Sequence, residues 1–296
     1  MSLLRTLLRI ALALVGIVVI VVVALLVQGH GLLHRRVSNP VPALRVAPDS
    51  SLRERGRHLV QVNCSGCHSE GEGGNIVLAG GTYNFFDIPG GPKLGTLYAP
   101  NLTPGGAIRS ASDGQISRAV REGIGFDGKP LLVMPSAHYH AMSDRDLAGL
   151  INYLRSQPAV PGEVPKRKLG LMGYLILGVH QFETSAELPV TVPIETPAES
   201  PDSTYGAYLV PILGCSDCHG PDYRGGRKGQ FPPIGPDLLH LVSNRPLTTF
   251  ERALRHGIKS AGGALDPMQM PWHIYANLSD TEVQAVYAFL RGRTVN

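Results

Sequence analysis

The chain has 296 residues, of which 43% are hydrophobic and 17% charged, and its formal net charge at pH 7 is +4. This length allows two or three domains. Residues 50–158 carry ten basic against nine acidic side chains, and residues 204–296 carry nine against seven. Neither segment has the basic excess typical of a nucleic-acid-binding protein, so we expect no nucleic-acid partner.

An apolar segment lies near the N-terminus. Residues 10–27 carry no charge, and at ~1.5 Å per residue they would form ~27 Å of helix, close to the hydrocarbon thickness of a bilayer. A cleaved signal peptide is the alternative, but its apolar core is usually shorter and no small-x-small cleavage site follows here. We therefore predict an uncleaved anchor in residues 1–36, spanning the bilayer from about residue 7 to residue 27.

A proline-containing tether, residues 37–49, leads into the first predicted domain, residues 50–158. A helix is expected from about residue 51 to residue 64, and it delivers the sequence C-x-x-C-H at its end. This pattern is typical of covalent c-type haem attachment, in which two thiols add to the haem vinyl groups and the imidazole binds the iron. Cys64 and Cys67 are thus the predicted attachment residues, and His68 is the predicted iron ligand. Frequent glycine and proline from residue 71 to residue 106 predict a loop around this haem.

The same pattern recurs at residues 215–219, and the two motifs use all four cysteines of the chain. Cys215 and Cys218 are predicted to attach a second haem, with His219 as its iron ligand. A thioredoxin-like pair and a zinc site are the alternatives. Neither explains a histidine directly after each cysteine pair, so two covalent c-type haems are the predicted cofactors.

The two halves resemble each other well beyond the cysteines. In the first half, three apolar residues and a glycine follow the i, i+3, i+4, i+7 spacing of one helix face: Ile116, Ala119, Val120 and Gly123. The second half has the same spacing at Phe250, Ala253, Leu254 and Gly257. A Met-Pro pair follows in each half, and then a serine predicted to open a capping box with Asp146 or Glu282 three residues later. Each box leads into a helix with one apolar stripe. These repeats predict two copies of one small helical domain, the second being residues 204–296.

Residues 159–203 join the two predicted domains. The apolar run 169–179 is too short to span a bilayer, and we expect a helix packed against one domain or across the pair. A second membrane contact beside the basic residues 166–168 is the alternative. Residues 183–203 are rich in Pro, Glu, Ser and Thr, which predicts an extended linker without a core of its own.

Each iron needs either a sixth ligand or an open site. Met134 and Met270 occupy the same repeat position, and a thioether opposite histidine favours reduced iron and raises its potential. A buried methionine that only fills space is the alternative. Five other side chains compete as ligands: Met142, Met268, His138, His140 and His273. Because none of the three histidines has a histidine counterpart in the other repeat, we predict Met134 and Met270. His58 also lacks a counterpart and is expected to be a surface or packing residue.

With these motifs the chain resembles membrane-anchored dihaem cytochromes built from class I cytochrome c domains. Residues 97–104, 117–123 and 127–130, with the pair at 134–135, are similar to cytochrome subunits of membrane-bound alcohol and gluconate dehydrogenases. Those subunits usually carry three haems, whereas this chain has motifs for two. The resemblance covers residues 50–158 well and 204–294 more generally. It implies an all-α fold with an N-terminal transmembrane helix and two tandem haem domains.

Two functions from different classes fit this chain. The first is single-electron transfer from a membrane dehydrogenase or quinol-oxidising complex to a terminal acceptor such as an oxidase or reaction centre. The second is dihaem catalysis, as in a peroxidase or thiosulfate dehydrogenase, suggested by the separation of 151 positions from Cys64 to Cys215. Catalysis needs a labile iron site, whereas the repeat supplies the same methionine twice, so we predict a carrier without catalytic residues.

The same chemistry predicts a location. Cytochromes of the c type are matured outside the cytoplasmic membrane, so a single-pass anchor would hold both haem domains on the periplasmic side. The predicted partners are the lipid bilayer and membrane redox complexes or dehydrogenase subunits. Near-balanced domain charges predict only modest electrostatic steering of these encounters.

Overall fold

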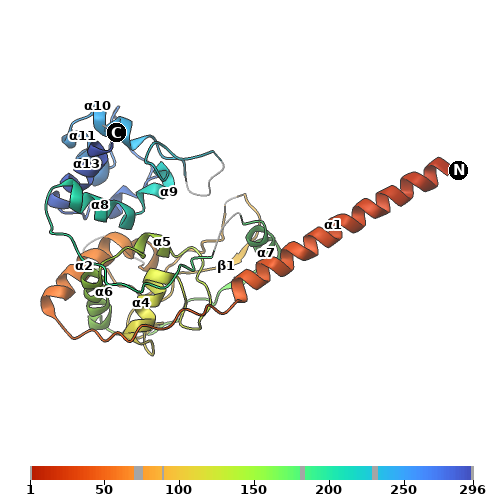
Figure 1. The fold of residues 1–296 in the computed structure, drawn as a ribbon, viewed down its shortest axis with the longest axis horizontal. Helices are drawn as coiled ribbons and strands as arrows, with labels where there is room; N and C mark the ends of the chain where they lie inside the picture. Colours follow the sequence, from red (N-terminus) through yellow and green to blue (C-terminus); the bar gives the residue numbers. More distant parts are fainter. Residues whose placement is uncertain (1, 70–75, 89, 181–183, 229–232, 295–296) are drawn as a thin grey trace.

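The computed structural model describes residues 2–69, 76–88, 90–180, 184–228 and 233–294. Parts of the predicted haem loop, residues 71–75 and 89, and the first residue of the predicted linker lie outside this range. The described residues form thirteen helices and one two-stranded ladder. The predicted all-α fold is confirmed, and Figure 1 shows one long helix that projects from two helical bodies.

The projecting helix is α1, Ser2–His34. Its apolar window is wholly exposed within the chain, and its length and composition suffice to cross a membrane. The helix continues past the predicted end of the span because Gln28 to His34 includes no helix-breaking proline. Its last turns pack against α7, Leu171–Gly178.

The first helical body contains α2 (Ser50–Asn63), α3 (Ser65–His68), α4 (Asp113–Glu122), α5 (Ser136–Tyr139) and α6 (Asp144–Ser156). Asp49 caps α2 through its carboxylate. Helices α2 and α6 cross over a shared apolar core. Its most deeply buried members, at most 1% exposed, are Val60, Leu78, Ile108, Met142 and Ile151.

The second body repeats this order with α8 (Ser203–Ile212), α9 (Cys215–His219), α11 (Leu247–His256), α12 (Trp272–Tyr275) and α13 (Asp280–Gly292). An added helix, α10 (Leu238–Asn244), packs against α13. Helices α4 and α11 both end at a glycine in the left-handed conformation, Gly123 at φ 63° and Gly257 at φ 61°. The repeat read from the sequence is therefore a repeat of backbone geometry.

Each body depends on one close helix crossing. A Cβ added to Gly56 of α2 would stand 1.8 Å from the Gly149 carbonyl oxygen of α6. In the second body, a Cβ on Gly206 of α8 would stand 2.0 Å from the Ala285 carbonyl oxygen of α13. Real Cβ atoms do not approach backbone this closely, so both crossings require glycine.

We expect Gly56→Ala and Gly206→Ala each to lower the free energy of unfolding of its own body by about 1–3 kcal/mol, the usual cost of overpacking. Denaturant unfolding monitored by haem-region absorption measures the effect. Gly31→Ala on α1 is the matched control, because no heavy atom lies within 4 Å of its added Cβ. Equal stability of all three variants would contradict the close-crossing account.

The two predicted capping boxes differ in the structure. Ser279 and Glu282 form the complete reciprocal pair at the start of α13. At the start of α6, Ser143 accepts from the Asp146 backbone N–H, but the Ser143 backbone N–H donates to the Tyr208 hydroxyl and not to the Asp146 carboxylate. The prediction of a full box there was wrong, because the shorter Asp146 carboxylate is held instead by Arg55 and Tyr208.

The connecting segment is fastened to the first body. A short antiparallel ladder pairs β1 (Gly95–Thr96) with β2 (Lys168–Leu169), and α7 follows. Beyond it, the backbone N–H groups of Ser185 and Glu187 donate to carbonyls of the first body, and Ile194 accepts from Asp144. The described linker residues from Ser185 to Ile194 thus lie against the first body.

Candidate haem sites and the interface between them

Both C-x-x-C-H motifs lie on short helices directly after the first long helix of each body. None of the four cysteines forms a disulfide. Burial raises the pKa of Cys64 and that of Cys215 to about 12. A thioredoxin-like pair depends on a lowered thiol pKa. The described residues also contain no group of three or more His, Cys, Asp or Glu arranged to hold a metal ion, so the arrangement favours haem attachment over both alternatives.

The two motif histidines are held in the same way. His68 Nδ1 donates to the Pro100 carbonyl oxygen at 2.8 Å, and His219 Nδ1 donates to that of Pro236, also at 2.8 Å. Burial lowers the pKa of both imidazoles, and the bond to the carbonyl opposes this in part. A neutral ring with its proton on Nδ1 presents Nε2 as a metal ligand.

The carbonyl acceptors were not identified from the sequence. In the first body the loop is secured by buried Asn101, which accepts from the backbone and side chain of Thr103 and donates to the Val160 carbonyl. In the second body Asp237 caps α10 directly after Pro236. The sequence feature that could have identified these carbonyls is a proline followed by Asn or Asp in both repeats.

The two predicted methionine ligands lie at equivalent places. Met134 borders the core of the first body and Met270 that of the second, each followed by a proline that begins a short helix, α5 or α12. Met142 is fully buried in the first core, whereas the side chain of Met268 is 86% exposed. Ligation at the individual positions stays a prediction.

The competing histidines have other contacts. His138 Nε2 lies 2.8 Å from Asp217 Oδ1 of the second body, and His140 Nδ1 lies 3.0 Å from the Arg121 carbonyl oxygen. His273 is exposed. These positions make all three poorer candidates for a sixth ligand than the paired methionines.

Unused buried donors also fit a bound haem. Among the described residues, Arg118 Nε, Arg121 Nε and Trp272 Nε1 are buried without a hydrogen-bond partner. Buried donors are normally paired, and haem propionates are strong acceptors. Trp272 directly follows the Met270-Pro271 pair in the sequence, and its indole nitrogen would lie 2.4 Å from a Cβ added to Gly257 at the end of α11. The residues present therefore fit the group that the motifs imply.

The two attachment motifs meet at the contact between the bodies. A Cβ added to Gly66 of α3 would stand 2.6 Å from Ile274 Cδ1 of α12. At the equivalent place His138 of α5 contacts Asp217 of α9. Each domain's Met-Pro helix thus packs on the other domain's attachment helix, which gives the pair approximate two-fold symmetry.

The same symmetry extends through the first helix of each body. Val62 of α2 packs in the core of the second body, and Ile212 of α8 packs in that of the first. His58 Nε2 lies 2.8 Å from Glu282 Oε2, while Tyr208 donates to Asp146 Oδ2 at 2.8 Å. The surface or packing role predicted for His58 is therefore an interdomain contact.

A buried ion network joins the bodies at this contact. Arg55 donates to Asp146 through two nitrogens at 3.0 Å each, and to Glu282 at 3.2 Å. Both carboxylates are almost completely buried. Burial alone would raise the pKa of Glu282, but the hydrogen bond and charge of His58, the Ser279 backbone N–H and Arg55 lower it to about 2.

This lowered pKa predicts acid sensitivity of the contact. The folded-state pKa lies below the ordinary value of 4.5, so its stabilisation is present above about pH 4.5 and lost as pH falls toward 2. We expect a loss on the order of 3 kcal/mol over that range. Denaturant unfolding at a series of pH values measures it, and Glu282→Gln should lose less stability between pH 4.5 and 2. Equal losses in both proteins would contradict the assignment.

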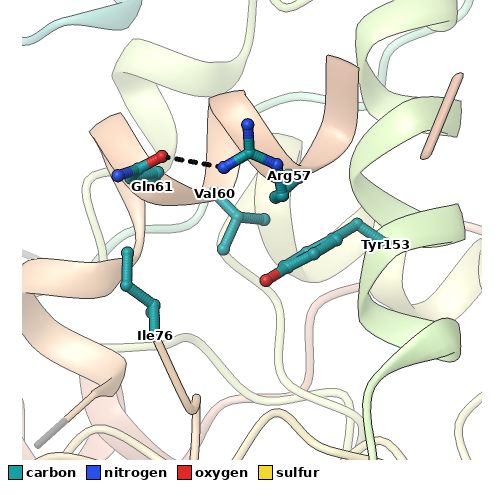
Figure 2. A pocket seen from close by; sticks show the side chains of 5 residues that line it. All are labelled: Arg57, Val60, Gln61, Ile76 and Tyr153. Carbon is teal, nitrogen blue, oxygen red and sulfur yellow. Dashed lines mark hydrogen bonds between the residues drawn. The ribbon is translucent and has the colours of Figure 1, made fainter. Parts of the chain in front are cut away.

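A small hollow beside α2 carries no substrate site. It is lined by Arg57, Val60, Gln61, Ile76 and Tyr153, with Arg57 Nη1 donating to Gln61 Oε1 at 3.3 Å (Figure 2). Its volume of about 20 Å³ lies far below the ~300–1,000 Å³ of typical small-molecule sites.

The fold and the repeated motif define a protein with two cytochrome c-type domains. Residues 52–154 match the family described as cytochrome c oxidase, cbb3-type, subunit III, and residues 203–294 match the cytochrome c family. Both domain types carry covalently bound c-type haem, so the predicted cofactors are confirmed.

Several relatives of this chain are named as cytochrome subunits of dehydrogenases. The gluconate 2-dehydrogenase cytochrome c subunit of Pantoea cypripedii is 30% identical over 280 residues, covering 82% of this chain and 60% of that protein. The fructose dehydrogenase cytochrome subunit of Gluconobacter japonicus is 32% identical over 123 residues, covering 36% and 24%. The quinone alcohol dehydrogenase cytochrome c subunit of Gluconobacter oxydans is 36% identical over 95 residues, covering 28% and 20%.

These matches confirm the predicted resemblance to cytochrome subunits. The chain spans less than two thirds of the length of each of these relatives. The substrates and complexes in their names are therefore properties of those proteins. For this chain they are proposals.

Proposed function

We propose that this chain is a membrane-anchored two-haem electron carrier that serves as the cytochrome component of a membrane dehydrogenase system. The observation that carries the proposal is the symmetric contact between the two attachment helices, α3 and α9, with the facing helices α12 and α5. Electron tunnelling weakens steeply with distance, so two redox groups attached on either side of one contact suit transfer between them.

The residues have separate tasks in this proposal. Cys64, Cys67, Cys215 and Cys218 attach the haems, which when bound supply iron that accepts and releases one electron. His68 and His219, oriented by the carbonyls of Pro100 and Pro236, would each offer Nε2 to an iron. Met134 and Met270 would supply the second ligand of each iron. Both histidines are buried, and burial lowers their pKa, which favours the neutral imidazole that a metal ligand requires.

The anchor and the partners follow from α1 and the relatives. The length and apolarity of α1 support a single-pass anchor in the cytoplasmic membrane, with both domains on the periplasmic side, where c-type cytochromes are matured. The names of the relatives support a dehydrogenase as electron donor. A terminal oxidase or reaction centre is the proposed acceptor.

The purified full chain in detergent tests the proposal. We expect two covalent haems per chain, two one-electron steps in a redox titration, and low-spin iron in both oxidation states. After rapid photoreduction of one haem, the electron should equilibrate between the two before it leaves the protein. High-spin iron together with peroxide turnover would contradict the carrier function and favour a dihaem enzyme.

A further inference from the structure

Helix α7 presents an apolar face that none of the described residues covers. Leu171, Met172 and Val179 on or next to this helix are 73%, 43% and 45% exposed. The opposite side is buried against α1 and a small apolar cluster that includes Leu33, Leu177 and Leu169. Three large apolar side chains on and directly after one short helix are unusual on a water-exposed surface.

The position of α7 along α1 indicates what covers this face. A Cβ on Gly29 would stand 2.1 Å from the Tyr174 carbonyl oxygen, and one on Gly178 would stand 2.2 Å from that of Leu25. The two helices thus run antiparallel in close contact, with the C-terminal end of α7 beside Leu25 and its N-terminal end farther along α1. Small residues allow such close approach between membrane helices.

The contact between α7 and α1 lies at the end of the predicted membrane span. Helix α1 has 33 residues, or ~50 Å, whereas about 20 residues cross the hydrocarbon. Polar side chains begin at Gln28, whose amide lies 3.0 Å from His180 Nε2, and His34 Nε2 lies 3.2 Å from the Tyr174 hydroxyl. A tyrosine at this depth is typical of the headgroup region.

The exposed charged residues also indicate that α7 lies at the membrane interface. Exposed basic side chains lie just beyond both helices, at Arg35, Arg36, Lys166 and Lys168. An apolar face bordered by lysine and arginine is the pattern of a segment lying in the interface of an anionic membrane. We propose that α7 is a second membrane contact, in which the face formed by Leu171, Met172 and Val179 inserts into the outer leaflet while the basic residues meet anionic headgroups.

The consequence is a fixed orientation of the first domain. A single helix leaves a domain free to rotate and tilt above the bilayer, whereas α1 and α7 together give two attachment points. Because α7 also joins β2 and the Leu94 and Leu97 cluster of the first body, inserting it would hold that body close to the membrane surface. The inference rests on the proposed function in one respect, that α1 is a membrane anchor.

Photolabelling of the full chain in lipid nanodiscs tests this contact. A lipid-soluble carbene reagent confined to the bilayer should label both α1 and the peptide that contains residues 171–179. Leu171→Glu with Met172→Glu should lower labelling of α7 roughly tenfold and leave labelling of α1 unchanged. Leu188→Glu, at a 79% exposed apolar residue of the linker, is the matched control and should change neither. Unaltered haem absorption in each variant shows that the domains remain folded.

Varying the lipid composition tests the insertion of the apolar face and the contact of the basic residues with anionic headgroups separately. Lys166→Glu with Lys168→Glu should lower α7 labelling about fivefold or more in discs with anionic phosphatidylglycerol, and leave it unchanged in neutral phosphatidylcholine. An equal fall in both lipids would overturn the role of the headgroup charge. Labelled α1 with unlabelled α7 would overturn the second contact and leave the anchor intact, whereas no labelling of α1 would overturn the anchor itself.

Discussion

Met134→Ala and Met270→Ala should each remove one half of the thioether-to-iron charge-transfer absorption of the oxidised protein. Loss of the thioether removes the ligand that stabilises ferrous iron. We therefore expect the potential of one haem to fall by on the order of 0.1–0.3 V, within the ~0.8 V range that axial ligands span. Optical redox titration of the full chain, with magnetic spectroscopy of the ferric state, measures both effects.

Met268→Ala is the matched control for the second site. Its side chain is 86% exposed, whereas Met270 borders the buried core two residues later. The control should keep both charge-transfer contributions and both potentials. If Met268→Ala removed the second contribution and Met270→Ala did not, the ligand assignment of the second haem would move to Met268. For the first haem, comparing Met142→Ala with Met134→Ala in the same way shows which of the two methionines is the iron ligand.

Arg55→Ala should be the most destabilising single change at the contact between the domains. Arg55 neutralises Asp146 of the first body and Glu282 of the second, and both carboxylates are almost fully buried. Removing one partner of a buried ion network leaves uncompensated buried charge, which costs about 3–5 kcal/mol. We expect the thermal midpoint to fall by roughly 6–20 °C, measured by haem-region absorption and circular dichroism.

Arg57→Ala provides the comparison on the same helix. Arg57 pairs with Glu54 at 2.7 Å, but their side chains are 47% and 68% exposed. Exposed pairs contribute about 0–1 kcal/mol, so this variant should unfold close to the wild type. A similar fall in both variants would mean that loss of any α2 arginine destabilises the chain, and the buried network would lose its assigned role. Slower electron equilibration between the haems in Arg55→Ala alone would further connect the network to function.

The cofactor class could be read from the sequence because its signals are local. Cys64, Cys67 and His68 lie within one helical turn, and the chemistry of attachment depends on that spacing rather than on the rest of the fold. A helix start was also predictable where a cap defines it, as at Ser279. The failed capping box at Ser143 shows the limit, because a partner far away in sequence, Arg55, competes for the Asp146 side chain.

The sequence by itself determined an apolar N-terminal helix, two haem-attachment motifs and a repeated helical domain with a methionine at the same place in each copy. Periodicity, caps and covalent chemistry act over a few residues, so a linear pattern suffices to reveal them. Only the tertiary structure decided which carbonyl orients each histidine, that α7 lies against α1, and that His58 reaches Glu282, 224 positions away. Those contacts depend on how whole helices pack, and packing is a property of surfaces that residues distant in the chain build together.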